Sequence, residues 1–118
     1  AQERSIYDRL LPLSGFFNWS GPTITEANDG GLALAAAVLG RPDDADRHFT
    51  AAIELCERGG TRAFLSRCHF DWARVLADRG DATLAREHFE IAIALGEELG
   101  MTGPFGVVPR GRALLESL

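Results

Sequence analysis

The chain has 118 residues, of which 46% are hydrophobic and 25% are charged, and this composition is typical of one globular domain. Its formal net charge of −5 argues against direct nucleic-acid binding, because phosphate binding requires clustered positive charge. No segment approaches the length of a membrane-spanning helix. The two cysteines, Cys56 and Cys68, are expected to be buried thiols in a reducing cytoplasm.

The first 22 residues predict a short helix followed by an irregular, aromatic segment. The start of the chain has neither an initiator Met nor an apolar signal region, so we expect a cut inside a longer protein. Residues 2–11 have apolar side chains at helical spacing and predict an amphipathic helix. Residues 12–22 are expected to form a loop, whose rings at Phe16, Phe17 and Trp19 either pack on the helices or form a contact patch.

The next segment predicts a buried helix. Thr23 and Glu26 are spaced as in a capping box, in which the two side chains bond to each other's backbone amides. We therefore expect a helix from residue 23 to about residue 39. Its second half, 32–39, is apolar on nearly all faces, which is typical of a central helix. No part of the chain predicts a strand.

Three further helices and a final helical segment are expected between glycine-containing turns. Thr61 and Asp81 are candidate caps for two of these helices. Pro109 predicts a kink or a delayed start in the final segment, because proline lacks the N–H of the helix interior. Each helix is expected to end at the glycine of the turn that follows it. The predicted ranges are 42–58, 62–78, 82–99 and 102–118.

Segments 41–60 and 81–100 repeat each other with a period of 40 residues. A fixed period of this size is typical of a helical array. We therefore predict an all-α fold, a single helical-repeat domain over 1–118 with units at about 23–60 and 61–100 and flanking helices at 2–11 and 102–118. The identical residues are Ala45/Ala85, His48/His88, Phe49/Phe89, Ala52/Ala92, Ile53/Ile93, Leu55/Leu95, Glu57/Glu97 and Gly60/Gly100.

This pattern resembles the tetratricopeptide repeat. Small residues at Ala45 and Ala52 would let two helices touch, and the ring of Phe49 would fill the seam between them. The period departs from the usual value of about 34 residues. The helices are therefore expected to be longer by about a turn and a half. The resemblance implies an array of antiparallel helix pairs that binds other proteins.

A narrower resemblance covers segments 7–15, 39–60, 70–80 and 94–101. They look like the C-terminal repeat region of bacterial multi-domain signalling ATPases, a family that includes LuxR-type transcriptional regulators and nucleotide-cyclase-associated ATPases. The chain has no lysine and no glycine-rich phosphate loop, so the ATPase site is not expected here. The resemblance implies a non-catalytic domain for protein–protein or interdomain contacts in signal transduction, with possible homo-oligomers.

No catalytic, metal-binding or cofactor-binding set is predicted. His48 and His88 recur at the repeat period, which is typical of packing residues. Cys56, Cys68 and His69 do not have the spacing of a standard zinc site. Because no Ser/His/Asp or Cys/His set is placed together by spacing, we expect no enzyme activity.

The predicted binding surface is a groove lined by the first helix of each unit. Arginine suits such a surface, because its planar guanidinium grips carboxylates in a bidentate manner. The groove would bind an acidic peptide or another domain of the same protein. The alternative is that these arginines only solvate a helix face. The groove residues of the prediction are Leu34, Val38, Arg67, Phe70, Arg74, Asp78 and Arg110, with Gly30 and Leu114 beside them.

A second hypothesis comes from the aromatic residues. A pocket lined by Phe16, Phe17, Trp19 and Trp72 would make the domain a small-molecule sensor that binds an inducer. An enclosed apolar cavity would favour the sensor. A stable dimer without such a cavity would favour the interaction domain.

Overall fold

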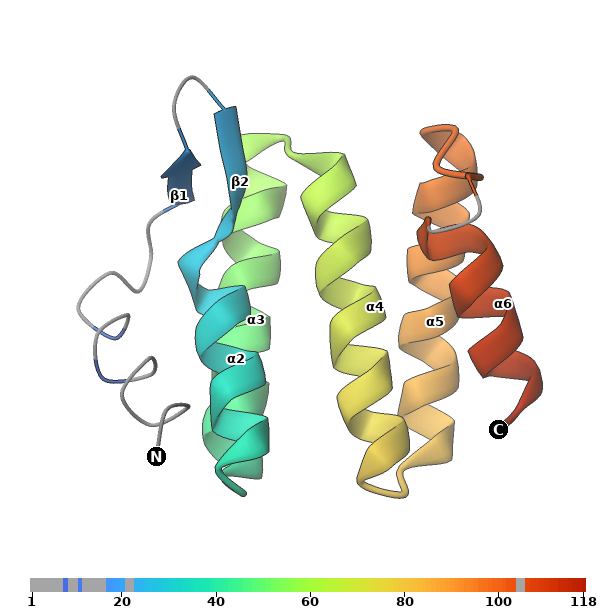
Figure 1. Cartoon of the computed structure of the whole chain (residues 1–118), viewed down its shortest axis with the longest axis horizontal. Helices are drawn as coiled ribbons and strands as arrows, with labels where there is room; N and C mark the ends of the chain where they lie inside the picture. Colours follow the sequence, from blue (N-terminus) through green and yellow to red (C-terminus); the bar gives the residue numbers. More distant parts are fainter. Residues whose placement is uncertain (1–7, 9–10, 12–16, 21–22, 104–105) are drawn as a thin grey trace. The chain divides into compact units, whose positions relative to one another are not determined.

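The computed structural model describes residues 8, 11, 17–20, 23–103 and 106–118 (Figure 1). Five helices and one two-stranded sheet lie within them, so the predicted helical class is confirmed, with a hairpin added. The chain divides into two compact units, Ala1–Gly59 and Gly60–Leu118. The elements are β1 (Phe17–Ser20), β2 (Thr23–Ala27), α2 (Asn28–Val38), α3 (Pro42–Gly59), α4 (Arg62–Asp78), α5 (Ala82–Glu98) and α6 (Val107–Glu116).

The hairpin is the main departure from the sequence prediction. Strands β1 and β2 pair antiparallel, from Phe17 opposite Ala27 to Ser20 opposite Thr23. The prediction of a helix from residue 23, and of no strand, was therefore wrong. Thr23, Ile24 and Thr25 are all β-branched and favour a strand over a first helical turn. The predicted helix at 2–11 lies, apart from two residues, outside the described part of the chain.

In the first unit, α2 and α3 form a close pair of helices. Leu32 and Ala36 of α2 cluster with Ala45 of α3, and all three are buried. Leu34 and Val38 are 37% and 68% exposed, so the prediction of a central, buried helix holds for only one face of α2. The sequence also predicts one apolar stripe on α3, and all of it is buried except the half-buried Ile53; the predicted stripe is Ala45, Phe49, Ala52, Ile53 and Cys56. The buried residues of α3 are Ala45, His48, Phe49, Ala52 and Cys56.

The turns after α2, α4 and α5 share one backbone geometry. Gly40, Gly80 and Gly100 all have positive φ, between 73° and 91°. This conformation is costly for residues that have a Cβ atom. The residue after each glycine donates its amide to the carbonyl five positions back, as Asp81 does to Leu76 at 2.9 Å. The predicted stops at these three glycines are confirmed.

In the second unit, α4 and α5 run antiparallel and α6 packs on them (Figure 1). The rings of Phe70 and Phe89 meet edge to face, with centroids 6.0 Å apart. Alanines surround them, which lets the helices approach closely. The cluster consists of Phe70, Ala73 and Leu76 from α4, Ala85, Phe89 and Ala92 from α5, and Val107 from α6.

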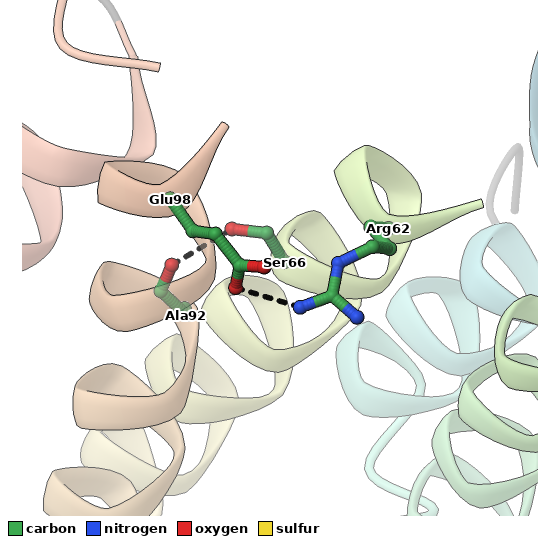
Figure 2. Close-up of polar contacts among 4 residues, drawn as sticks. All are labelled: Arg62, Ser66, Ala92 and Glu98. Carbon is green, nitrogen blue, oxygen red and sulfur yellow. Dashed lines mark hydrogen bonds and ion pairs between the residues drawn. The ribbon is translucent and has the colours of Figure 1, made fainter. Parts of the chain in front are cut away.

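Two polar contacts join α4 to α5 near one end of the pair (Figure 2). The buried Ser66 hydroxyl donates to the carbonyl of Ala92 at 2.8 Å, so it leaves no unsatisfied donor in the core. Arg62 and Glu98 form an ion pair with an N–O distance of 2.7 Å. Both ends of this pair are exposed, so its contribution to stability is small.

The first residues of α4, α5 and α6 test the predictions of where these helices begin and which side chains cap them. The Asp81 carboxylate accepts from the amide of Leu84 at 3.4 Å, as predicted for a cap. Thr61 makes no side-chain cap, so that prediction was wrong, and the amide of Arg62 donates to the Gly60 carbonyl. Helix α6 begins after Gly106, which confirms the delayed start. Pro109 lies in its first turn, where no intrahelical N–H is lost.

Matching positions of α3 and α5 bury the same side chains. Phe49 and Phe89 are both fully buried, although they lie 40 residues apart. The same is true of the alanine pairs on either side, Ala45/Ala85 and Ala52/Ala92. Each phenylalanine therefore fills the interior of its own unit between small residues.

Candidate functional site

The predicted groove residues lie on three helices of the two units. Arg67, Phe70 and Arg74 are on α4, three and four residues apart, and Asp78 follows one turn later. Arg110 is on α6 of the same unit. The exposed Leu34 and Val38 belong to α2 of the first unit. Of these residues, Phe70, Arg74 and Arg110 come together, and we call them the two-arginine cluster.

In the two-arginine cluster, two guanidinium groups lie over one aromatic ring. The Cζ atom of Arg110 is 5.0 Å from the centroid of the Phe70 ring, and that of Arg74 is 5.8 Å away. Phe70 is only 1% exposed, whereas both arginines are exposed. Phe70 therefore lies beneath the surface that was predicted to be a groove. Its ring attracts the cations and holds their positions.

Helix α6 lies beside the Phe70 ring because two glycines, one on α6 and one on α5, allow the two helices to approach closely. A Cβ atom on Gly111 would lie 3.0 Å from Cγ1 of Ile93 on α5. A Cβ atom on Gly96 of α5 would lie 2.8 Å from Cγ2 of Val108 on α6. The two missing side chains let α6 lie close to α5, and this places Arg110, next to Gly111, over the Phe70 ring.

The charge on the cluster is not neutralised in the described part of the chain. Three other arginines of the same unit have carboxylate partners: Arg62 with Glu98 at 2.7 Å, Arg112 with Glu97 at 2.5 Å, and Arg67 with Asp71 at 3.8 Å. Among the described residues, no carboxylate lies within ion-pair distance of Arg74 or Arg110. Two positive charges thus converge on one patch, which favours an anionic ligand.

A second cluster, not predicted from the sequence, joins α4 and α5 through two histidines. The Nδ1 atoms of His69 and His88 are 2.9 Å apart. Trp72 stacks on the His88 ring at a centroid distance of 4.4 Å. One Nδ1 must carry the proton and the other must accept it, so the pair shares a single proton between the rings. The sequence places His69 and Trp72 on one face of a helix, but it does not indicate that His88 of α5 packs against them.

One member of the pair, His69, is set up to stay uncharged. Burial, and then the charge of His88, lower the pKa of His69 from 6.5 to about 4. His69 is therefore neutral at pH 7. Among the described residues, no three His, Cys, Asp or Glu side chains gather in a way that could hold a metal ion. The pair can share or exchange a proton, and it packs as part of the α4–α5 seam.

The aromatic residues of the sensor hypothesis do not form a described cavity. Phe16 lies outside the described residues. Phe17 and Trp19 are in strand β1 of the first unit. Trp72 is in the second unit, where it stacks on His88. The inducer pocket therefore stays a prediction.

Comparisons with known proteins give no match to a family model, to a curated protein or to a solved structure. None of the helices in the described ranges combines the length and the apolar character that crossing a membrane requires.

Proposed function

We propose that this chain is a non-catalytic, tetratricopeptide-like repeat domain that binds a carboxylate-bearing segment of a protein at the two-arginine cluster. Its setting is a cytoplasmic signalling or transcription-regulating ATPase of bacteria, which the sequence resembles. The bound segment belongs to another domain of the same protein or to a regulatory partner.

The repeat proposal is supported by matched burial. Phe49 and Phe89 fill equivalent positions between equivalent alanines. The turns at Gly40 and Gly80, also 40 residues apart, share a positive φ. Helical arrays are built from repeated helix pairs, each of which buries the same side chains at the same positions. Such arrays commonly present a surface to a partner rather than a reaction site.

The binding proposal rests on one observation, the convergence of Arg74 and Arg110 on the ring of Phe70. Bringing two like charges together is unfavourable unless an anion or solvent screens them. The ring attracts both groups and so offsets part of this repulsion. The guanidinium groups are held ready for a carboxylate, so less side-chain entropy is lost when it binds.

The proposal is tested with a fluorescein-labelled acidic peptide, twelve residues rich in Asp and Glu, by fluorescence anisotropy. We expect Arg74→Gln and Arg110→Gln each to weaken binding by about tenfold, the effect of losing one charge-assisted contact. Binding should also weaken with added salt.

Arg112→Gln is the matched control. Arg112 lies on the same helix as Arg110, two residues away, but its guanidinium is already paired with Glu97. Equal losses in Arg110→Gln and Arg112→Gln would show that only net charge matters, and the proposed site would be rejected. Affinity unchanged by Arg74→Gln and Arg110→Gln would reject it as well.

A further inference from the structure

The outer surface of α5 carries apolar side chains bordered by carboxylates. Leu84 and Ile91 are 43% and 41% exposed, and they lie seven residues apart on one face of the helix. An open hollow of about 450 Å³ is lined by Glu87, Glu90, Ile91 and Ala94. We call these five residues the α5 outer face. Its apolar part is not covered in the described structure.

The equivalent face of α3, 40 residues earlier, has a different chemistry. Three of its four polar side chains interact within the helix. Arg47 pairs with Asp44 at 2.8 Å, and the Thr50 hydroxyl donates to the Asp46 carbonyl at 2.9 Å. Two exposed apolar residues of α5 thus stand where α3 has an ion-paired aspartate and an alanine. The residues of α3 that correspond to the α5 outer face are Asp44, Arg47, Thr50, Ala51 and Glu54.

The charge of the α5 outer face selects the kind of partner. Glu87 and Glu90 lie within one helical turn, and among the described residues neither carboxylate has an ion-pair partner. If two copies of this chain met through the same face, at least four carboxylates would approach one another, which is unfavourable. A partner that offers both an apolar anchor and positive charge relieves this repulsion and covers Ile91.

We propose that the α5 outer face is a docking surface for a basic amphipathic helix. An apolar side chain of that helix enters the hollow against Ile91 and Ala94. Lys or Arg side chains one turn away pair with Glu87 and Glu90. This surface differs from the two-arginine cluster in position and in sign of charge, so the domain presents one site for an acidic partner and another for a basic partner.

The test uses ¹⁵N-labelled chain and two synthetic 14-residue helical peptides. One has Leu at helical spacing with Lys between, and the other has the same Leu pattern with Glu between. We expect the basic peptide to shift the backbone amide signals of α5 from Leu84 to Leu95, and the acidic peptide to leave them unchanged. No shift in α5 with the basic peptide, or equal shifts with both peptides, would overturn the proposal.

Variants then separate specific docking from attraction to an acidic protein. Glu87→Arg/Glu90→Arg should weaken binding of the basic peptide by about tenfold, since two partly exposed ion pairs are lost and reversed. Leu84→Asp/Ile91→Ala, which installs the residues found on α3, should weaken binding by a similar factor.

The matched control is Glu54→Arg/Glu57→Arg, which reverses two exposed carboxylates with the same spacing on α3. It changes the net charge of the chain by the same amount and should leave the affinity for the basic peptide within about twofold. A loss as large as that of the α5 variant would show attraction to overall charge and would overturn the proposal. The arginine variants of the two-arginine cluster are not used, so either proposal can fail alone.

Discussion

Helices α3 and α5 lie 40 residues apart in sequence and carry one phenylalanine each at an equivalent, fully buried position. Their outer faces differ: α3 pairs Arg47 with Asp44, whereas α5 exposes Leu84 and Ile91 beside unpaired glutamates. Packing constrains the buried positions, because a change of even one methylene is felt there. The exposed positions are under no such constraint, so the two helices can carry different surfaces for different partners.

Removal of the buried phenylalanine rings should have the largest effect on stability, and it tests whether the two helix pairs have equivalent interiors. Phe89→Ala and Phe49→Ala should each lower the stability of their own helix pair by about 3–5 kcal/mol, because a cavity replaces a buried ring. Amide hydrogen exchange of α4–α5 for the first variant, and of α2–α3 for the second, would measure this. Ile91→Ala, on the exposed face, should cost less than about 1 kcal/mol. Equal costs for Phe89→Ala and Ile91→Ala would contradict the assigned burial.

The second test concerns the buried His69. The matching position in the first helix pair, 40 residues earlier, is Asp29. The folded-state pKa of His69 is about 4, below the 6.5 of an unperturbed histidine. Between these values the unfolded chain binds more protons. The free energy of unfolding should therefore fall by about 3 kcal/mol as pH drops from 6.5 to 4, and His69 should contribute no pH dependence above pH 6.5.

Urea unfolding of a Trp19→Phe chain, followed by the fluorescence of Trp72 at several pH values, measures this loss. Carboxylates also titrate near pH 4, so the comparison is with His69→Gln. The variant removes the titrating group but keeps a polar side chain. We expect its stability to vary less with pH than that of the wild type. Identical pH profiles would show that His69 does not titrate as described.

A third comparison uses two helical glycines, one in a crowded contact and one facing open space. Gly96→Ala should destabilise the α5–α6 contact by about 1–2 kcal/mol, because its Cβ would meet Val108 at 2.8 Å. Gly30→Ala should stabilise α2 by up to about 1 kcal/mol, because nothing lies within 4 Å and alanine favours helix. Thermal unfolding of both variants checks the signs. The same sign for both would contradict the close approach of α6.

The smallest expected effect is at the exposed ion pair between Arg62 and Glu98. Arg62→Gln should lower stability by no more than about 1 kcal/mol, because both side chains are solvated. Ser66→Ala, one turn away and buried, should cost about 1 kcal/mol through its lost hydrogen bond to Ala92. Urea titrations at low and high salt separate the two, since only the Arg62 effect should shrink with salt.

Local signals were enough to predict α3, α4 and α5 to within one residue at each end. Pro42 and Asp81 mark helix starts, and Gly80 and Gly100 mark ends through positive φ. Each of these signals depends only on neighbouring residues. The segment 23–27 carried two conflicting local signals, a capping box and a β-branched run, and the strand prevailed over the predicted helix.

The candidate site was less predictable because it depends on tertiary contacts. The sequence predicted Phe70, Arg74 and Arg110 as surface residues, but the burial of Phe70 depends on α6, which lies outside the two repeated segments. The pairing of His69 with His88 depends on which turn of α5 faces α4. No periodicity within a single helix contains that information.

Arg74 and Arg110 are proposed to form the acidic-partner site, and NMR of the arginine side chains observes this site residue by residue. The Nε–Hε signals of the chain would be followed during titration with the Asp/Glu-rich peptide. We predict shifts for Arg74 and Arg110, and no shift for Arg62 and Arg112, whose guanidinium groups are already paired. Equal shifts at all four arginines, or none at Arg74 and Arg110, would contradict binding at this site.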